Sequence, residues 1–145
     1  MGDIAKDINS KFSTVKEKAL INILYTGNWI SSYQNEFFKP FGISRQQYNI
    51  LRILKGADSA LKVQTIKNRM LERAPNATRL MDKLHAKGLI ERFPCENDRR
   101  VVFIEITAEG KELLESIAKK FDFDLLKNIS DEEATTLSAI LDKIR

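Results

Sequence analysis

The stretch CENDRRVVFIEIT, residues 95–107, changes character halfway along. Its first half is polar and charged and contains two adjacent arginines, Arg99 and Arg100, whereas its second half is β-branched and aromatic until its last residue. This run over residues 101–106, together with a similar run over residues 89–93, predicts two strands joined by a polar loop. We therefore expect a hairpin with a basic tip.

Two short helical patterns precede this hairpin. The first runs through apolar residues between Val63 and Leu71. The second begins at Pro75, a favoured first-turn residue, and ends at Gly88, a favoured residue after a helix end. Because only residues 72–74 separate the two patterns, the helices must turn sharply, which predicts a helix-turn-helix followed by a β wing.

Longer helices are predicted before this unit. Residues 11–38 contain no internal proline and repeat apolar side chains at near-helical spacing, which predicts one long helix. Ser44 and Gln47 have the spacing of a capping box, which predicts the start of a second helix there. Gly56 is expected to end that helix.

The C-terminal part is also predicted to be helical. Thr107 can cap a helix whose apolar residues extend to Phe121 and Leu125, and Ser130 with Glu133 forms a second capping box that opens the last helix. The predicted fold is mainly α with a small β wing.

Composition indicates one domain spanning residues 1–145, because 43% of the residues are hydrophobic and 30% are charged. No apolar run approaches the roughly 18–20 residues that span a bilayer, and the N-terminus lacks the apolar segment of a secretory signal. One cysteine permits neither an internal disulfide nor a cysteine metal cluster. We expect a cytoplasmic protein with no membrane partner and no cofactor.

The positive charge is concentrated in the centre of the chain. Residues 62–100 contain ten basic and five acidic residues, a net charge of +5, whereas all other residues together carry −1. Such a distribution favours a polyanionic partner such as nucleic acid. The alternative is an ordinary solvated surface.

The second short helical pattern has two faces. The apolar face, which is expected to pack on the core, consists of Ala77, Leu80, Met81 and Leu84. The polar face consists of Asn76, Arg79, Lys83 and Lys87. In the major groove of DNA, arginine can donate two hydrogen bonds to guanine and asparagine can pair with adenine. Lysines near the helix end suit phosphates, whereas a merely solvated helix is the alternative reading.

The hairpin tip strengthens the DNA-binding interpretation. Asp98 and Arg100 are two residues apart, so the carboxylate could hold the guanidinium in an extended pose. A pre-oriented arginine suits a narrow minor groove, where negative potential is concentrated. A surface ion pair worth at most about 1 kcal/mol is the alternative.

The segments NATRLMDKLHAKGLIER and NDRRVVFIEITAEG, residues 76–92 and 97–110, resemble the MarR family of bacterial winged-helix transcription regulators. The similarity rests on four short motifs, which are Thr78-Arg79-Leu80, Lys87-Gly88-Leu89, Asp98-Arg99-Arg100 and Ile106-Thr107-Ala108-Glu109-Gly110. Ile106 stands where the family usually has leucine. The turn at residues 72–74 departs from the pattern because it has no glycine, and Arg73 could contact a base or only a phosphate.

The resemblance implies a homodimer on a pseudo-palindromic operator in double-stranded DNA, and we expect the protein to act as a repressor. Residues 44–106 would form the winged helix-turn-helix DNA-binding lobe, and residues 11–38 and 108–145 the dimerisation helices. The residues implied to face the major groove are Pro75, Asn76, Thr78 and Arg79, with Lys83 on the same helix. The wing residues are Asp98, Arg99 and Arg100, of which Arg100 would enter the minor groove.

Many members of the family are controlled by ligands that bind between the dimerisation helices and the DNA-binding lobe. Aromatic side chains suited to a small aromatic or phenolic ligand are Trp29, Tyr33, Phe37, Phe38 and Tyr48. The alternative is that these residues belong to the core.

Other classes of function find less support. One histidine, His85, and no glycine-rich phosphate loop or catalytic triad spacing argue against an enzyme, and a metal site is not expected. Cys95 could respond to oxidants, although an uninvolved thiol is the simpler reading. The remaining rival is a winged-helix adaptor that binds proteins, which should tolerate loss of Arg79 and Arg100.

Overall fold

The computed structural model describes residues 2–120 and 124–145. It is mainly helical with a small antiparallel sheet, as the sequence predicted. The elements, in chain order, are α1 (Ile4–Asp7), α2 (Val15–Phe38), the 3-10 helix η1 (Lys39–Phe41), α3 (Arg45–Ala57), β1 (Leu61–Lys62), α4 (Val63–Arg69), α5 (Ala77–Ala86), β2 (Ile90–Pro94), β3 (Val102–Ile106), α6 (Ala108–Lys120), η2 (Asp124–Leu126) and α7 (Asp131–Asp142).

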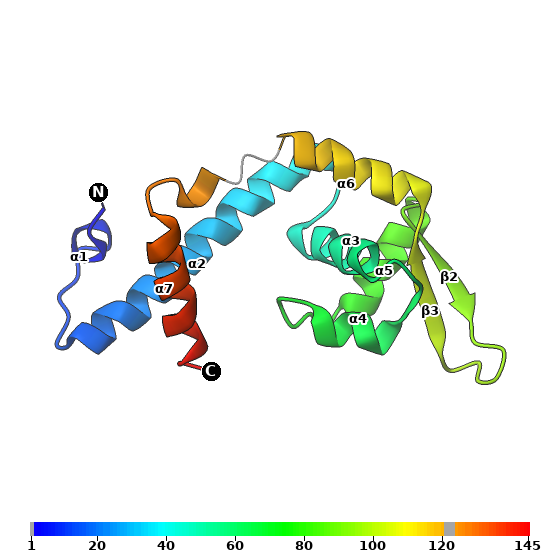
Figure 1. Cartoon of the computed structure of the whole chain (residues 1–145), viewed down its shortest axis with the longest axis horizontal. Helices are drawn as coiled ribbons and strands as arrows, with labels where there is room; N and C mark the ends of the chain where they lie inside the picture. Colours follow the sequence, from blue (N-terminus) through cyan, green and yellow to red (C-terminus); the bar gives the residue numbers. More distant parts are fainter. Residues whose placement is uncertain (1, 121–123) are drawn as a thin grey trace.

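Two parts are visible in Figure 1, a lobe and an arm. The lobe comprises α3, α4, α5, the sheet and α6, and the arm comprises α1, α2 and α7. The core lies within the lobe, where α3, α5, the sheet and α6 bury apolar side chains against one another. Its largest fully buried side chains are Phe38, Ile50, Leu51, Leu54, Ile66, Met81, Leu84, Ile90, Ile104 and Ile117.

The predicted hairpin is present. Strands β2 and β3 pair antiparallel with Ile90 opposite Ile106 and Pro94 opposite Val102. A third strand, β1, adds to the other edge of β3 through Leu61 opposite Ile104. The sequence did not predict β1 because two residues are too short to show the two-residue periodicity of a strand.

Helix α2 begins at Val15 rather than at Lys11. The hydroxyl of Thr14 accepts a hydrogen bond of 3.1 Å from the backbone N–H of Glu17, and the Glu17 carboxylate accepts one of 2.7 Å from the N–H of Ser13. These reciprocal bonds satisfy amides that have no helical partner, so they fix the helix start at this point.

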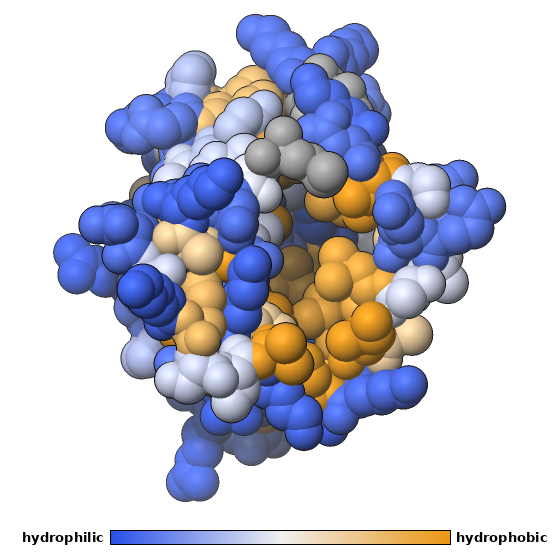
Figure 2. Space-filling view, turned by 90° about the vertical axis from the view of Figure 1, so that its left-hand side faces the viewer, coloured by the Kyte–Doolittle hydropathy of each residue, from blue (hydrophilic) through white to orange (hydrophobic). Residues whose placement is uncertain are grey.

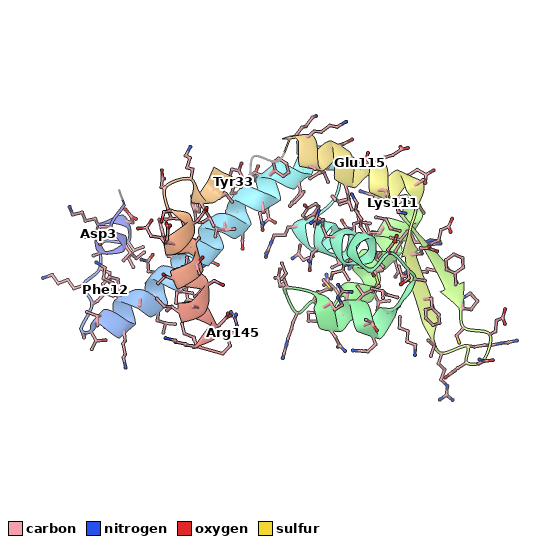
Figure 3. The ribbon with its side chains drawn as sticks, in the orientation of Figure 1. Asp3, Phe12, Tyr33, Lys111, Glu115 and Arg145 are labelled. Carbon is pink, nitrogen blue, oxygen red and sulfur yellow. The ribbon has the colours of Figure 1, made fainter. Side chains whose placement is uncertain are left out.

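The short helix α1 was not predicted. Its N-cap residue, Asp3, lies near the free end of the arm together with Phe12 (Figure 3). The Lys18 ammonium donates a hydrogen bond of 3.0 Å to the Asp3 carboxylate and lowers its pKa, and a bond from the Ala5 N–H lowers the pKa further. This contact ties α1 to α2.

Helix α3 opens with the predicted capping box. The Gln47 N–H donates to Ser44 Oγ over 3.1 Å, and the Ser44 N–H donates to Gln47 Oε1 over 2.9 Å. The predicted end at Gly56 is wrong, because the helix continues to Ala57 and Asp58 adopts the left-handed conformation with φ of 51°. Aspartate tolerates that conformation better than most residues, so it can serve where glycine was expected.

Helix α6 belongs to the lobe. Leu114 and Ile117 are buried in the core, and α6 contacts α3. Thr107 caps the helix as predicted, since its Oγ1 accepts a 3.1 Å bond from the Gly110 N–H. The helix is described to Lys120. Of the apolar positions predicted farther along, residue 121 lies outside the described residues and Leu125 lies in η2.

Helix α7 opens with the second predicted capping box, formed by Ser130 and Glu133, and it buries none of its side chains. Helix α2 buries only Phe38, at its last residue. Figure 2, viewed from the side of the arm, shows hydrophobic surface gathered around a hollow. The arm therefore exposes apolar faces that the lobe does not cover.

In the parts of the chain that the structure describes, every helix is too short or too polar to cross a membrane.

Candidate nucleic-acid interface

Helix α5 has the two faces that the sequence predicted. Ala77, Met81 and Leu84 are buried, and Leu80 is half-buried against the core. The predicted DNA-facing residues Asn76, Thr78, Arg79 and Lys83 are all exposed. The apolar face thus anchors the helix and leaves a continuous polar face in solvent.

The start of α5 differs from the prediction. Pro75 is not in the helix, which begins at Ala77 with Asn76 as its N-cap residue. The Ala77 N–H donates a 3.0 Å bond to the Ala74 carbonyl, which closes a four-residue turn. Pro75 occupies the second position of that turn, where its fixed φ is favoured.

Asn76 makes no side-chain capping bond to the helix that it precedes. Its amide group is exposed at the end of α5 and remains available to an external partner. An asparagine at this position usually caps the helix, but Asn76 does not. Its side chain therefore has no capping role within the protein.

The connection between α4 and α5 is longer than predicted. It spans residues 70–76 rather than the three residues expected, because α4 ends at Arg69 and Met70 is extended. Two contacts from α3 hold it. Arg45 forms a 2.9 Å ion pair with Glu72, and the Leu71 N–H donates a 3.0 Å bond to Asn49 Oδ1.

A shallow depression lies beside this connection. It is lined by Lys67, Asn68, Met70, Arg73, Ala74 and Pro75. Arg45 partly neutralises Glu72, the acidic neighbour of Arg73, so the depression presents Lys67 and Arg73 as its charged groups. This is a surface suited to a phosphate group next to the N-terminus of α5.

The predicted role of Asp98 at the wing tip is wrong. Its carboxylate does not hold the Arg100 guanidinium; it accepts a 2.9 Å hydrogen bond from the backbone N–H of Arg100. The Val101 N–H also donates to the Asp98 carbonyl over 3.0 Å, and the Cys95 N–H donates to the Val101 carbonyl over 2.9 Å. Aspartate commonly bonds the amide two residues ahead in this way. Asp98 therefore shapes the backbone, and the exposed side chains of Arg99 and Arg100 carry the charge.

A second ion pair, which the sequence analysis missed, links α5 to the wing. The Arg92 guanidinium on β2 contacts the Asp82 carboxylate on α5. Asp82 is the acidic residue within α5, so this pairing offsets a charge that would repel a polyanion. The two residues are ten positions apart on different elements, and no local periodicity signals such a pair.

The aromatic residues predicted to line a ligand pocket are not brought into one pocket. Trp29 and Tyr33 lie on the exposed side of α2, with 52% and 38% of their surface accessible, and Figure 3 places Tyr33 on the arm. Phe37 packs edge-on against Phe38 with 5.2 Å between ring centroids, and Phe38 packs against Tyr48 at 4.6 Å. Position along α2 separates these side chains, because Trp29 and Tyr33 lie in the arm, whereas Phe37 and Phe38 lie at the end of the helix, where it meets the core.

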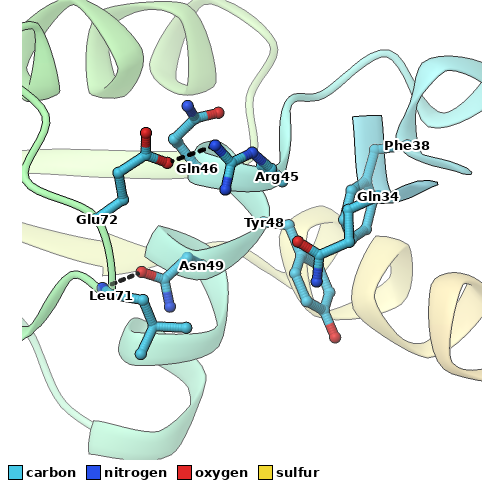
Figure 4. Close-up of a pocket in the computed structure, with 8 residues that line it drawn as sticks. All are labelled: Gln34, Phe38, Arg45, Gln46, Tyr48, Asn49, Leu71 and Glu72. Atoms are coloured by element: carbon cyan, nitrogen blue, oxygen red, sulfur yellow. Dashed lines mark hydrogen bonds and ion pairs between the residues drawn. The ribbon is translucent and has the colours of Figure 1, made fainter. Parts of the chain in front are cut away.

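A pocket containing Tyr48 does exist where α2, α3 and the connection before α5 meet (Figure 4). Its walls are Gln34, Phe38, Arg45, Gln46, Tyr48, Asn49, Leu71 and Glu72. The Arg45–Glu72 ion pair and the Leu71–Asn49 hydrogen bond cross it, so a molecule bound here would lie beside the contacts that hold the connection.

His85 and Cys95 have no evident site role. His85 Nδ1 lies 3.2 Å from the Ile90 carbonyl, and Cys95 is a half-buried free thiol. Among the side chains that the structure describes, in residues 2–120 and 125–145, no cluster of three potential metal ligands occurs.

A sharp helix pair, an anchored second helix with a polar outer face, and an adjoining β wing with an arginine tip together define a winged helix-turn-helix protein. The sequence pattern of the MarR family matches residues 43–102, from just before α3 to the first residue of β3. Together with the similarity to known relatives, this match shows that the chain belongs to the MarR family.

Known relatives extend the similarity beyond the lobe. The HTH-type transcriptional regulator PecS from Dickeya dadantii is 30% identical over 76% of this chain and 69% of its own length. A crystal structure of a cysteine-to-serine mutant of MarR from Escherichia coli, complexed with operator DNA, is 25% identical and covers 99% of both chains with a TM-score of 0.73. These relatives are regulators of transcription rather than enzymes, in agreement with the expectation from the sequence.

The fold is shared more widely. The structure of AbsC, a MarR family transcriptional regulator from Streptomyces coelicolor, has a TM-score of 0.80 with 20% identity, covering 93% of this chain and 95% of that one. The arrangement of lobe and arm thus persists where most side chains differ.

Proposed function

We propose that the protein is a transcriptional regulator, acting as a repressor, that binds a pseudo-palindromic operator in double-stranded DNA as a homodimer. The observation that carries this proposal is the pairing of two exposed basic features in one lobe, the outer face of α5 and the tip of the wing. The MarR structure with operator DNA, which aligns over nearly the whole chain, supports it.

The outer face of α5 is suited to the major groove. Asn76 and Arg79 are exposed near its N-terminal end and present the amide and guanidinium groups that recognise base edges. Thr78 and Lys83 flank them, and Pro75, in the preceding turn, would lie against the sugar-phosphate backbone. Each good bidentate contact contributes roughly 1–3 kcal/mol of discrimination between bases.

The wing is suited to the minor groove. Asp98 fixes the backbone at Arg100, and this frees the guanidinium to extend from the tip. A narrow minor groove concentrates negative potential and therefore favours such an arginine. Arg99 would contact the adjacent phosphate.

The arm is suited to self-association. Large apolar residues exposed on it are Val15, Leu20, Ile23, Leu24, Tyr25, Trp29 and Tyr33 on α2, and Leu137, Ile140 and Ile144 on or after α7. Monomeric proteins rarely expose a continuous apolar surface of this kind. Pairing of two arms in a two-fold dimer would cover it and place the two α5 helices on half-sites about 10–10.5 base pairs apart.

A small aromatic or phenolic ligand is proposed to weaken DNA binding. The pocket of Figure 4 offers the Tyr48 ring, a half-buried arginine and the amides of Gln34, Gln46 and Asn49. A ligand carboxylate or phenolate that attracted Arg45 would compete with Glu72 and loosen the connection before α5. The relevant measurement is titration of hydroxybenzoates into the operator complex, with Tyr48→Ala expected to reduce the response.

The decisive experiment selects bound fragments from random double-stranded DNA and then measures affinity by mobility shift. A palindrome is expected, and Arg79→Ala and Arg100→Ala should each weaken binding at least tenfold, about 1.4 kcal/mol or more. Lys111→Ala is the matched control, because it removes a positive charge from α6, away from the wing tip (Figure 3).

The salt dependence separates this function from that of a protein-binding adaptor. The affinity of a DNA-binding protein for DNA falls steeply as the salt concentration rises, because counterions return to the phosphates that its basic residues neutralised. No selected sequence, unchanged affinity in both arginine variants or a flat salt response would refute the proposal.

A further inference from the structure

Gln47 is an unusual member of the core. Only 5% of its surface is accessible, and it is the single buried polar or charged side chain among residues 2–120 and 125–145, whose side chains the structure describes. A buried amide is unfavourable unless its donor and acceptor are both satisfied, whereas an apolar side chain of similar length would fill the same space without this requirement. Its presence therefore selects a particular arrangement of its partners.

Both ends of the Gln47 amide have partners, and they belong to different helices. Oε1 accepts a 2.9 Å bond from the Ser44 N–H, which completes the capping box of α3. Nε2 donates a 3.3 Å bond to the backbone carbonyl of Leu80 in α5. The two contacts fix the amide orientation. A flipped amide would place its NH2 group against the Ser44 N–H and its oxygen against the Leu80 carbonyl, and neither pair can form a hydrogen bond.

The bond to Leu80 acts on the DNA-reading end of α5. Leu80 immediately follows Arg79, and its carbonyl has a second lone pair beside the one used within the helix. Apolar contacts from Ala77, Met81 and Leu84 are non-directional and tolerate small slips. A hydrogen bond depends on distance and angle, so it restricts the rotation and translation of α5 relative to α3.

A second tether reaches the other end of the same helix. The Lys87 ammonium, just after α5, donates to the backbone carbonyl of Gly42. Gly42 precedes α3 and Gln47 lies in its first turn, so the two residues are close in sequence. The first turn of α5 and the residue after its last turn are thus both bonded to the region where α3 begins.

From this geometry we propose that Gln47 is a positioning residue for DNA reading, which sets the orientation of Arg79 and its neighbours through its bond to the Leu80 carbonyl. The inference rests on the proposed function, because it assigns a determinant of operator affinity to a residue that cannot touch DNA.

The test compares two substitutions that both weaken the capping box, of which only one affects the bond to Leu80. Gln47→Met keeps the length and burial of the side chain but removes both of its bonds, the one from the Ser44 N–H and the one to the Leu80 carbonyl. Ser44→Ala removes the serine hydroxyl from the capping box but leaves the bond to Leu80 intact. Operator affinity is measured by mobility shift, and stability by the melting temperature of the same samples.

We expect the two properties to separate. Gln47→Met should lower operator affinity about tenfold, about 1.4 kcal/mol, at a temperature where it is fully folded. Ser44→Ala should lower the melting temperature and leave operator affinity within about twofold of the wild type. If Gln47→Met does not fold, Gln47→Leu replaces it, since leucine is also apolar and cannot donate to the Leu80 carbonyl.

Hydrogen exchange of α5 gives a readout that is independent of DNA. Amides of residues 80–87 should exchange faster in Gln47→Met than in Ser44→Ala. Equal affinity in the two variants, or exchange in α5 that follows only the melting temperature, would overturn the positioning role. If the wild type binds no operator, the proposed function fails instead, and the exchange experiment still decides whether Gln47 positions α5.

Discussion

At the scale of single residues, Asp98 shows how a residue can serve binding without contacting the partner. Its carboxylate bonds the backbone of Arg100, and both residues are exposed at the wing tip. The acidic charge itself is unfavourable beside phosphates. The useful property of Asp98 is therefore its acceptor oxygen rather than its charge.

Substitution of Asp98 separates these two properties. Asp98→Asn keeps an acceptor oxygen for the Arg100 N–H and removes the negative charge, so operator affinity should be maintained or rise. Asp98→Ala removes the acceptor and frees the tip, so affinity should fall several-fold, within about 1 kcal/mol. Fluorescence anisotropy with labelled operator measures both. Equal losses in the two variants would instead indicate that the carboxylate contacts the guanidinium.

Individual residues were predictable to different degrees. The buried and exposed positions of α5 followed from its 3.6-residue periodicity, and Ser44, Thr107 and Ser130 were recognised as caps from spacing alone. The partner of the Asp98 carboxylate could not be predicted, because the backbone amide and the guanidinium both belong to Arg100 and are equally near in sequence. The backbone dihedral angles of the tip decide between them.

At the scale of elements, the packing of α6 on the sheet depends on one glycine. A Cβ at Gly110 would collide with the Leu89 carbonyl and lie 2.7 Å from Cγ1 of Ile106. The first turn of α6 can therefore approach the hairpin only because position 110 has no side chain. This contact joins α6 to the wing.

Gly110→Ala should therefore destabilise the fold. The expected loss in the free energy of unfolding is about 1–3 kcal/mol, since the backbone at Leu89 has to move. Gly56→Ala is the matched control, because position 56 is helical and open, and alanine there should stabilise by roughly 0.5–1 kcal/mol. Urea unfolding of both variants tests the prediction. A neutral Gly110→Ala would show that this close approach is not required.

Elements with long or strongly capped patterns were predicted from the sequence, and short ones were not. Helices α2, α3 and α7 and the β2–β3 hairpin were expected, with boundaries that differ by one to four residues. The short elements α1 and β1 were missed because four and two residues contain too little periodicity. The start of α5 was misplaced because Pro75 suits a turn as well as a first helical turn.

At the scale of the whole molecule, the arm and the lobe differ in how they bury apolar surface. The lobe encloses its own core, whereas α7 buries no side chain and α2 buries only its last residue. The structure therefore contains a lobe with its own core and a helical arm that lacks a complete set of packing partners. A second copy would supply them.

A charge on the apolar face of α7 tests this interpretation. Ile140→Glu places a carboxylate where apolar contact with a second copy is proposed, so the dimer should dissociate and operator affinity should fall sharply. Thr135→Glu adds the same charge on the opposite face of the helix and should do neither. Sedimentation velocity measures the mass of each variant, and circular dichroism confirms that both remain folded. A dimeric Ile140→Glu would place the interface elsewhere.

The sequence by itself determined the order of the longer elements, the polar and apolar faces of their helices and the basic centre of the chain. These features depend on residues within a few positions of one another. The tertiary structure alone decided that Arg45 pairs with Glu72, that Arg92 pairs with Asp82 and that Gln47 bonds Leu80. Such contacts join residues 10 to 33 positions apart, and only packing of the core brings them together.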